Sequence, residues 1–328
     1  MNKLLLFGAG KIGRSFIGQL FSQSGYEVVF VDINHEIIKQ LNQHRQYTVI
    51  IIDEVEKELL IRNVRGIHFS NESQIINEIC ESAIMAVSVG KSGIKAVIPL
   101  IAKGLLIRED YKKEAIDLII AENMRNADVF IYKELEKILP PGFPLNQRLG
   151  LVETSIGKMV PIIPSDVIKT NPLLVYAEGY NNLILDKNGF LNEIPDVAGL
   201  SPKENMKAWV DRKLFIHNFG HAATAYLGYS RNPSFTYTWQ ALNDSKVYDK
   251  VYQAMQQSAT VLLKMYPDEF SYKDMEQHIQ ELLKRFQNKN LGDTIFRVGC
   301  DLFRKLGPDD RVIIPLRTAL KFGLPYEC

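Results

Sequence analysis

Short apolar runs and a longer amphipathic stretch alternate at the start of the chain. Leu4–Phe7 is continuously apolar and predicts a buried strand. In Ser15–Ser24 the apolar side chains recur at helical spacing, and Tyr26–Val31 is a second, β-branched apolar run. A strand, a helix and a strand within about 30 residues have the size of one βαβ unit.

Further apolar runs continue this pattern through the first half of the chain. Ala83–Val87 and Leu118–Ala121 are short and almost continuously apolar, which is typical of parallel strands covered on both faces. Tyr47–Ile52 predicts another strand, and the charged stretch Asp53–Arg62 predicts a hairpin excursion after it. We therefore expect an α/β fold whose N-terminal domain contains a doubly wound parallel sheet.

The second half of the chain changes to helical periodicity. Three long stretches carry apolar residues at helical spacing and few strand signals: Asn205–Tyr229, Ser245–Met265 and Tyr272–Gln287. We place the domain boundary near residue 195, before the connection-like segment Asp196–Pro202. This predicts an α/β domain over 1–195 and a mainly α-helical domain over 196–328. Two domains of roughly 150 residues also suit the chain length.

Composition narrows the range of partners. The chain has 39 basic and 38 acidic residues, a net charge of +1, so no long-range attraction draws it to nucleic acid or to an anionic membrane. Its three cysteines, Cys80, Cys300 and Cys328, are too few and too scattered for a disulfide framework or a zinc site. No apolar run approaches the ~18 residues of a membrane span. We expect a cytoplasmic protein, monomeric by default, whose partner is a small molecule.

A glycine-rich turn joins the first predicted strand to the first predicted helix. The segment Gly8-Ala9-Gly10-Lys11-Ile12-Gly13 has the spacing Gly-x-Gly-x-x-Gly. In this context Gly8 permits the tight turn, Gly10 lets the backbone approach a pyrophosphate, and Gly13 lets helix and strand pack closely. Lys11 and Ile12 open the helix, whose first N–H groups would face the phosphates. These residues predict a Rossmann domain that binds a dinucleotide.

Asp32 bears on which dinucleotide is bound. It lies about 20 residues after Gly13, at the end of the second strand, where the mechanism needs a carboxylate. The carboxylate can accept hydrogen bonds from the adenosine ribose and would repel a 2′-phosphate, which favours NAD over NADP. The alternative is a glycine-rich turn that binds another nucleotide or none. Nearby Arg14 fits either a phosphate contact or a solvated helix residue.

One predicted helix, 211–223, carries polar side chains among apolar ones. At 100° per residue, Asn218 lies about 140° and His221 about 80° around an α-helix from Lys213. Leu214–Ile216 would otherwise mark a buried helix. Because buried polar groups are costly without partners, the spacing is compatible with a ligand-facing role. It is equally compatible with satisfied core polar residues and one surface lysine.

With these segments together, the sequence resembles the polyol-specific long-chain dehydrogenases, the mannitol dehydrogenase family. The resemblance runs through most of the chain and is more specific than any single motif. The matching segments are Phe7–Arg14, Glu122-Asn123-Met124, Lys213–Tyr226 and the block Arg285–Pro325, which contains Arg297-Val298-Gly299, Arg304-Lys305-Leu306 and Asp310–Pro315.

The resemblance implies a metal-independent hydride transfer between NAD and one carbinol carbon of a linear sugar alcohol. Lys213 matches the family's general acid/base, so an apolar pocket or a nearby cation should lower its pKa. Asn218 and Asn123 match residues that hydrogen-bond the reacting oxygen, as an oxyanion hole does. His221 matches a residue that holds a substrate hydroxyl.

Other positions match less completely. Arg297 and Lys305 match residues that line the substrate pocket, with an ordinary salt bridge as the alternative for each. His217 departs from the family pattern, and we interpret it as structural. Gly157 stands where the family usually has an aspartate, and the strand Tyr180–Asp186 lacks the family's tryptophan. Both departures lie where the substrate would be recognised.

Three functions remain open at this point. The leading hypothesis is the interconversion of mannitol 1-phosphate and fructose 6-phosphate. A phosphorylated substrate needs cations, and the C-terminal block supplies several candidates. The first alternative is a reductase for a hexuronate such as tagaturonate or fructuronate, where the same cations would meet a carboxylate. The second is an NAD-binding sensor without turnover, which would not need a base. The candidate cations are Arg297, Arg304, Lys305 and Arg311.

Overall fold

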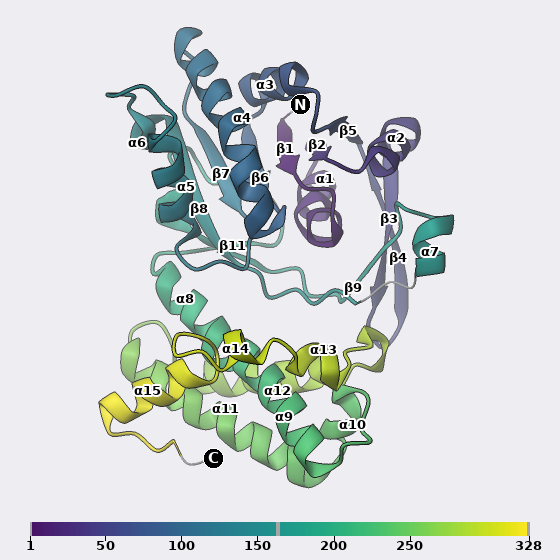
Figure 1. Cartoon of the computed structure of the whole chain (residues 1–328), viewed down its shortest axis with the longest axis vertical. Coiled ribbons are helices and arrows are strands. Elements are labelled where there is room, and N and C mark those ends of the chain that lie inside the picture. Colours follow the sequence, from purple (N-terminus) through teal and green to yellow (C-terminus); the bar gives the residue numbers. More distant parts are fainter. Residues whose placement is uncertain (1, 162–164, 327–328) are drawn as a thin grey trace. The chain divides into compact units, whose positions relative to one another are not determined.

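The computed structural model describes residues 2–161 and 165–326, and the chain divides into two compact units, Met1–Met206 and Lys207–Cys328 (Figure 1). The boundary expected near residue 195 falls before strand β11 (Leu200–Lys203). This strand pairs in parallel with β10 (Leu183–Asp186), so the sheet of the first unit extends to residue 203.

The first unit contains strands and helices in alternation. Among the described residues, its other strands are β1 (Lys3–Phe7), β2 (Glu27–Asp32), β3 (Gln46–Ile52), β4 (Glu56–Arg62), β5 (Val64–His68), β6 (Ile84–Val87), β7 (Ile116–Ile120), β8 (Leu149–Ser155) and β9 (Val175–Ala177). Its helices are the π-helical turn η1 (Gly13–Gly18), α1 (Gln19–Gln23), α2 (His35–His44), α3 (Glu72–Glu81), α4 (Gly90–Asp110), α5 (Ala127–Glu136), α6 (Leu145–Arg148), α7 (Ser165–Thr170) and the 3-10 turn η2 (Lys187–Gly189).

The main sheet is doubly wound. Within the described residues it has eight strands in the order β11-β10-β8-β7-β6-β1-β2-β5. The strands from β8 to β5 are all parallel, and β10 runs antiparallel to β8. The chain reverses its direction across the sheet at β1, between β2 and β6. The carboxyl ends of the strands at this switch point are where open α/β sheets bind ligands.

Both faces of the sheet are buried, as the continuous apolar runs predicted. Leu4 and Leu6 of β1 pack in one core with Phe16 of η1, whereas Leu5 and Phe7 pack in a second core with the apolar side chains of α3, α4 and α5. Alternation along the strand therefore supplies both cores. The predicted hairpin is also present, since β3 pairs antiparallel with β4, and β9 joins β3 in a second, smaller sheet.

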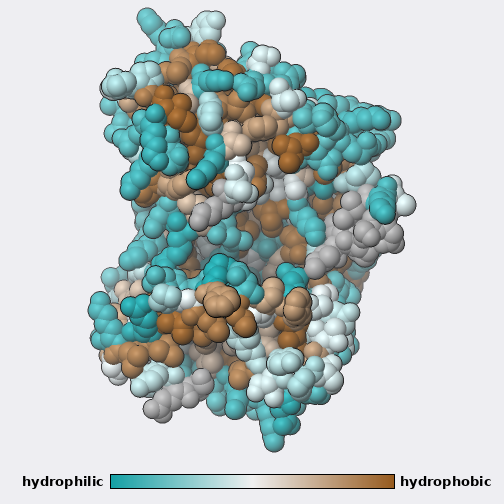
Figure 2. Space-filling model, in the orientation of Figure 1, coloured by the Kyte–Doolittle hydropathy of each residue, from teal (hydrophilic) through white to brown (hydrophobic). Residues whose placement is uncertain are grey.

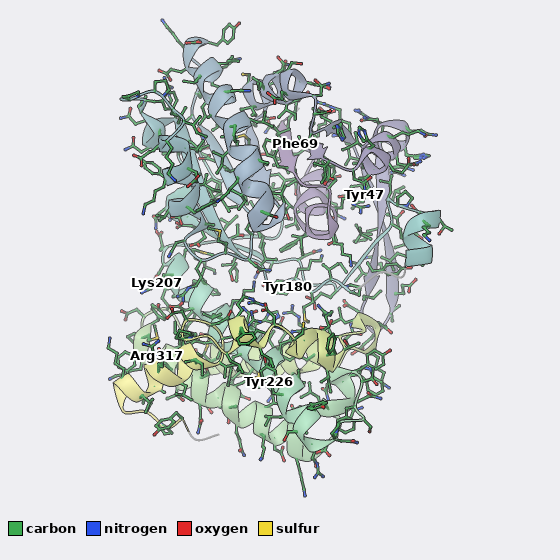
Figure 3. All side chains as sticks on the ribbon, viewed as in Figure 1. Tyr47, Phe69, Tyr180, Lys207, Tyr226 and Arg317 are labelled. Atoms are coloured by element: carbon green, nitrogen blue, oxygen red, sulfur yellow. The ribbon has the colours of Figure 1, made fainter. Side chains whose placement is uncertain are left out.

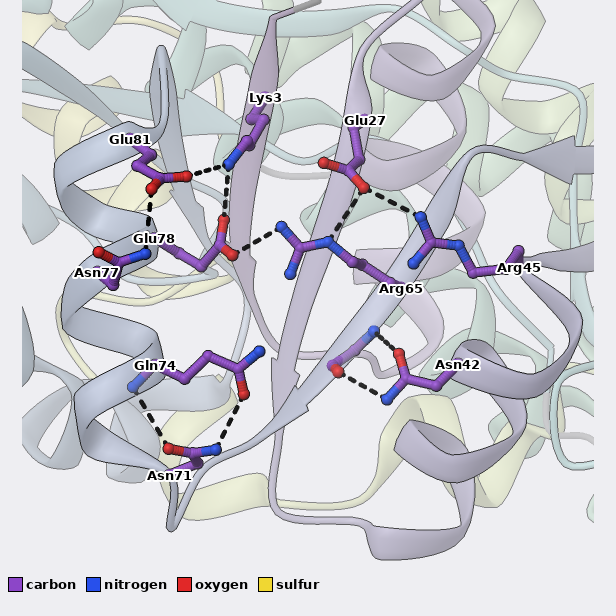
Figure 4. A network of polar contacts seen from close by, with 11 residues as sticks. Lys3, Glu27, Asn42, Arg45, Arg65, Asn71, Gln74, Asn77, Glu78 and Glu81 are labelled. Atoms are coloured by element: carbon purple, nitrogen blue, oxygen red, sulfur yellow. Dashed lines mark hydrogen bonds and ion pairs between the residues drawn. The ribbon is translucent and has the colours of Figure 1, made fainter.

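An ion-pair network ties together the amino ends of three parallel strands (Figure 4). The buried carboxylate of Glu78 contacts Lys3 of β1 at 3.3 Å and Arg65 of β5 at 2.7 Å. Arg65 also contacts Glu27 of β2 at 3.0 Å, and Arg45 reaches the same carboxylate at 3.2 Å. Each charge has an opposite partner, which a buried carboxylate requires. The network lies at the opposite strand ends from the glycine-rich turn.

The second unit is helical. Its elements in the described residues are α8 (Met206–Arg212), the π-helical turn η3 (Lys213–Asn218), α9 (Phe219–Arg231), α10 (Thr238–Leu242), α11 (Ser245–Met265), α12 (Tyr272–Phe286), the 3-10 turn η4 (Lys289–Leu291), α13 (Ile295–Gly299), α14 (Leu302–Lys305) and α15 (Ile313–Phe322). The periodicity predicted α11 and α12 well. Across the described part of the chain, no helix is both long and apolar enough to cross a membrane.

Two predicted helices differ from the expectation of regular α-helix. Ser15–Ser24 contains most of η1 followed by the short α1, and the stretch 205–229 is divided by η3 into α8 and α9. In a π-helical turn the backbone hydrogen bonds join residues five apart. In each turn one backbone carbonyl accepts a hydrogen bond from a hydroxyl of another element. The Tyr47 hydroxyl donates to Arg14 O, and the Ser258 hydroxyl donates to Phe215 O. Such an insertion is a recognised cause of helix distortion.

Candidate functional site

The glycine-rich turn follows β1 in the geometry that its spacing predicts. Gly8 has a φ of +103°, and a Cβ there would lie 2.1 Å from the carbonyl oxygen of Ser88. A Cβ on Gly13 would lie 2.1 Å from the carbonyl oxygen of Gly8. A Cβ on Gly10, in contrast, would meet none of the described atoms within 4 Å. The first and third glycines are thus required by packing, and the second leaves the backbone open to a ligand.

Asp32 ends β2 beside this turn and helps to hold it. Its Oδ2 accepts a hydrogen bond from Ala9 N at 2.7 Å, and its Oδ1 accepts one from Asn34 N at 2.9 Å. A cavity of about 290 Å³ opens here at the carboxyl edge of the sheet. Its lining includes Gly8, Gly10, Asp32, Ile33, Phe69 and Val89. Figure 3 labels Phe69, whose ring lies near the amino-terminal strand. Main-chain groups, a carboxylate and apolar side chains together suit a dinucleotide.

Two basic residues of the turn are already engaged by the protein. Arg14 is buried, so its interpretation as a solvated helix residue is wrong. Its Nε donates to Ala9 O at 2.7 Å and its Nη1 donates to Pro172 O at 2.9 Å. Burial lowers the pKa of Arg14 to about 10. Lys11 donates to Pro161 O at 2.9 Å. Ile12 is half-buried against the first core.

Asn123 lies in the first unit, in the loop that follows β7, and is exposed. Its neighbour Glu122 accepts hydrogen bonds from Val89 N at 2.6 Å and Gly90 N at 2.8 Å, at the start of α4. Burial raises the pKa of Glu122, although these two hydrogen bonds act in the opposite direction. Glu122 therefore fixes the loop that carries Asn123 to the cavity edge that Val89 lines.

In the second unit, η3 begins at Lys213 and ends at Asn218. Because the π-helical turn joins residues five apart, these two side chains lie about one turn apart, and the angle of 140° expected for an α-helix is wrong. Lys213 is partly buried. Burial, first, and the positive charge of Arg311, second, lower the pKa of Lys213 to about 8. The lowering expected of a general base is therefore present.

His221 and Arg297 meet at one carboxylate. Nε2 of His221 lies 2.9 Å from Oδ2 of Asp293, and the guanidinium of Arg297 forms an ion pair with Oδ1 of the same residue. Asp293 is buried, whereas the Arg297 side chain is 39% exposed. His217 is buried beside His221, and burial places the pKa of His217 well below its usual value. This agrees with a structural role for His217.

The other predicted cations lie on the same C-terminal segment. Lys305 is buried, donates to Val298 O at 2.7 Å, and has a lowered pKa chiefly because of burial. Arg304 contacts Asp310 at 3.0 Å, and Arg311 contacts it at 2.8 Å. Tyr226 of α9 donates to Gly299 O at 3.2 Å, which attaches this segment to the helix after η3 (Figure 3). The same segment carries exposed apolar side chains, among them Phe296 of α13 and Phe303 of α14. Figure 2 shows hydrophobic surface over this part of the second unit.

The departure at Gly157 also has a structural counterpart in the first unit. A Cβ on Gly157 would lie 3.2 Å from the ring of Tyr180, so Tyr180 takes up space beside this glycine (Figure 3). The next residue, Lys158, is buried and its Nζ donates to Asn181 Oδ1 at 2.5 Å. Burial lowers the pKa of Lys158 to about 8. Any larger side chain at position 157 needs Tyr180 to move.

Asp293 is a functional candidate that the sequence analysis missed. The signal for it is the i,i+4 spacing of Asp293 and Arg297 across the start of α13, with Thr294 capping the helix between them. No cluster of histidine, cysteine and carboxylate residues in the described ranges 2–161 and 165–326 is arranged to hold a metal ion.

Comparison with known proteins supports the resemblance seen in the sequence. Residues 2–199 match the mannitol dehydrogenase Rossmann domain, and residues 205–328 match the mannitol dehydrogenase C-terminal domain. A mannitol-1-phosphate 5-dehydrogenase from Geobacillus stearothermophilus is 36% identical over 94% of this chain and 80% of its own length. One from Caldanaerobacter subterraneus is 33% identical over 99% of this chain and 83% of its own length.

Solved structures agree on the fold. A substrate-free D-sorbitol dehydrogenase superposes with a TM-score of 0.84 at 14% identity, covering 98% of this chain and 77% of that chain. The Pseudomonas fluorescens mannitol 2-dehydrogenase, in a ternary complex with NAD and D-mannitol, gives a TM-score of 0.73 at 13% identity, covering 99% and 76%. With both family domains matched in order and relatives above 30% identity over nearly the whole chain, this chain belongs to the mannitol dehydrogenase family.

Proposed function

We propose that this protein is an NAD-dependent dehydrogenase that interconverts mannitol 1-phosphate and fructose 6-phosphate. The observation that carries the proposal is Lys213, a lysine with a pKa of about 8 placed one π-helical turn from Asn218. The identity of the substrate rests on the two relatives, which are both named mannitol-1-phosphate 5-dehydrogenases.

The residues of the first unit fit NAD. Gly10 leaves room for a pyrophosphate against the main chain, and the helix that begins after it offers backbone N–H groups. The carboxylate of Asp32 accepts hydrogen bonds from the ribose hydroxyls, and its negative charge repels a 2′-phosphate. Bound at these residues, NAD would supply the acceptor for the hydride of the carbinol carbon.

The contribution of Lys213 is to move one proton. In oxidation its neutral amine takes the proton of the substrate hydroxyl, and in reduction its ammonium returns that proton to the carbonyl oxygen. Because its pKa is about 8, the neutral form predominates above pH 8 and the ammonium below. Oxidation should therefore accelerate as the pH rises through 8, and reduction should accelerate as it falls.

The remaining site residues receive roles in binding. Asn218 and Asn123 donate to the reacting oxygen, and His221 holds a neighbouring hydroxyl. Arg297 and Lys305 line the substrate pocket. We further propose that the enzyme is cytoplasmic and monomeric and needs no metal.

A hexuronate reductase is the second candidate. Arginines such as Arg297 bind a carboxylate as readily as a phosphate. In addition, Gly157 replaces the aspartate that the family usually has, and the ring of Tyr180 lies beside this glycine. The same base and the same cofactor would serve both substrates.

The test is NADH oxidation with fructose 6-phosphate, fructose, tagaturonate and fructuronate, each repeated with NADPH and after exhaustive chelation. Turnover of fructose 6-phosphate alone, with NADH and undiminished by the chelator, is the expected result. Preference for a uronate would replace the proposed substrate. Inactivity with all four would favour a sensor that binds NAD without turnover.

A further inference from the structure

Two histidines of the first unit stack on each other beside the cofactor cavity. His35 begins α2 and His68 ends β5, and their ring centroids lie 3.5 Å apart with 8° between the ring planes. His68 is half-buried, whereas His35 is exposed. Ile33 and Phe69, which precede His35 and follow His68 in the sequence, both line the cavity at the carboxyl edge of the sheet. The stacked pair therefore belongs to two segments that form the wall of this cavity.

Both ring nitrogens of His68 have hydrogen-bond partners. Nε2 lies 3.0 Å from the carbonyl oxygen of Ile33, and Nδ1 accepts a hydrogen bond from Ser70 N at 3.3 Å. The Ser70 hydroxyl lies 2.7 Å from the same Nδ1. A carbonyl oxygen only accepts hydrogen bonds, so Nε2 must carry the ring proton. One neutral tautomer of His68 thus satisfies all of these contacts, with the proton on Nε2 and the lone pair on Nδ1.

The contact with Ile33 holds the segment that follows the cofactor carboxylate. Asp32 and His68 are partners in the parallel pairing of β2 with β5, and Phe69 N donates to Asp32 O at 3.0 Å. On the other side of Ile33, the side chain of Asn34 caps the start of α2. Ile33 lies between these two anchored residues, and His68 holds its carbonyl group. The ring of His68 therefore helps to set the conformation of the turn between β2 and α2.

The side chain of Ile33 is suited to meet an apolar part of a ligand. It is 75% exposed although it is large and apolar, and it lines the cavity of about 290 Å³ together with Phe69. Ligand cavities are lined mainly by such apolar and aromatic side chains. Asp32 is the carboxylate expected to meet the adenosine ribose, and adenine is the flat ring attached to that ribose. Ile33 and Phe69 are thus the apolar side chains nearest in sequence to the expected position of adenine.

We propose that His68 is a positioning residue of the cofactor site, whose Nε2–H holds the Ile33 carbonyl and so keeps the Ile33 side chain in the cavity wall for the adenine ring. His35 covers one face of the His68 ring, and Ser70 engages Nδ1, so rotation of the ring would break these contacts. His68 acts on cofactor binding through Ile33 and not on the chemical step. The binding role rests on the proposed function, whereas the tautomer of His68 does not.

Two substitutions separate the two contacts of His68. In His68→Gln the amide NH₂ group lies close to the former position of Nε2 and can still donate to Ile33 O, but the acceptor for Ser70 is lost. In His68→Asn the shorter amide replaces Nδ1 and can still accept from Ser70, but the donor to Ile33 O is lost. The two variants are similar in polarity and in the size of the change, so each serves as the control for the other.

The primary experiment measures the Kd for NADH by fluorescence titration. In His68→Asn the Kd should rise about 3- to 10-fold, the equivalent of one hydrogen bond, whereas in His68→Gln it should stay within about twofold of the wild-type value. His44→Asn changes an exposed histidine at the other end of α2 and should keep the wild-type Kd. The reverse order of the two His68 variants would show that His68 serves only the turn at Ser70, and it would overturn the proposal.

Steady-state kinetics give a readout that a merely structural role would not produce. With saturating fructose 6-phosphate, His68→Asn should raise the KM for NADH and leave kcat unchanged, because only binding of the cofactor is affected. A fall in kcat at an unchanged KM for NADH would contradict a role in cofactor positioning.

The tautomer is measured separately, by ¹⁵N NMR of the six histidines, with the His68 signals assigned through His68→Gln. Above the pH of ring protonation, the wild-type ring should carry its proton on Nε2. A proton on Nδ1 would overturn the proposal, whether or not the His68→Asn variant folds. If the wild-type protein does not bind NADH, the proposed function and the binding role of His68 both fail, while the tautomer stands. If it binds NADH and His68→Asn has the wild-type Kd, only the role of His68 fails.

Discussion

The two π-helical turns, η1 in the first unit and η3 in the second, use one backbone device for different purposes. In η1 the residues one turn apart are Gly13 and Gly18. Added Cβ atoms there would lie 2.1 Å from Gly8 O and 2.6 Å from the ring of Phe30, respectively. In η3 the residues one turn apart are Lys213 and Asn218, both only partly buried. The first turn lets the main chain approach a neighbouring backbone at Gly13 and an aromatic ring at Gly18, and the second brings two reactive side chains to one side.

The supports of the two turns are closely similar. A tyrosine hydroxyl from β3 donates to the Arg14 carbonyl at 2.7 Å, and a serine hydroxyl from α11 donates to the Phe215 carbonyl at 2.8 Å. What differs is the part of the residue that each turn uses, and this decides which substitutions can perturb each site. Side-chain substitutions should disable the chemistry of η3 without disturbing cofactor binding, whereas η1 works through its main chain.

The largest expected effect separates the two regions completely. Lys213→Ala should lower kcat by about 10²- to 10⁴-fold because it removes the proton carrier, while the Kd for NADH stays unchanged. Steady-state kinetics and NADH fluorescence titration measure the two quantities. Lys207→Ala, at an exposed position of α8, is the matched control and should keep full activity. A Lys213→Ala enzyme with most of its activity would remove this lysine from the mechanism.

Cofactor preference tests the first region alone. Asp32→Asn keeps an oxygen for Ala9 N but removes the charge that repels a 2′-phosphate, so the ratio of kcat/KM for NADPH to that for NADH should rise about tenfold, or 1.4 kcal/mol. Asp110→Asn, an exposed aspartate at the end of α4, serves as the control. If the ratio does not change, Asp32 only holds the glycine-rich turn.

A matched pair of hydroxyl deletions compares the supports of the turns. Tyr47→Phe and Ser258→Ala each leave a buried carbonyl without its hydroxyl donor, which should cost about 1–3 kcal/mol of unfolding free energy in urea titrations. Tyr47→Phe should weaken NADH binding, and Ser258→Ala should lower kcat at an unchanged Kd for NADH. The reverse assignment would show that η1 does not support cofactor binding and that η3 does not support the chemical step.

The smallest expected effect concerns the acid–base balance at η3. Arg311→Met removes the positive charge that contributes to the low pKa of Lys213, so this pKa should rise from about 8. The alkaline rise in the rate of mannitol 1-phosphate oxidation should move to higher pH. Arg317→Met removes an arginine that is 60% exposed and should leave the pH profile unchanged. A profile that moves equally in both variants would point to net charge rather than to Arg311.

The first region could be predicted from the sequence largely because its signals are local. Gly8 and Gly13 lie in the turn after β1, and Asp32 is the last residue of β2. The apolar runs of both strands are unambiguous, and the backbone itself sets the spacing of these residues. The buried state of Arg14 could not be predicted, because its partner Pro172 lies 158 residues away in the sequence.

The second region was harder, since its geometry depends on distant partners. Lys213, Asn218 and His221 were identified through the family resemblance, but the π-helical turn depends on Ser258, 43 residues further along the chain. Asp293 meets His221 only through the tertiary fold. Spacing on an ideal α-helix therefore gave a wrong angle between Lys213 and Asn218.

Gly8 and Gly13 are required by the fold, whereas Gly10 is not, and this difference would record loss of cofactor binding during evolution. A descendant that lost its cofactor would still have to keep Gly8 and Gly13, because the packing of β1 excludes any larger residue. Gly10 is under no such constraint from the fold, so only selection for the ligand preserves it. Among drifted homologues, an alanine or serine at the second glycine would be the earliest trace of abandoned redox chemistry, long before the motif itself disappears.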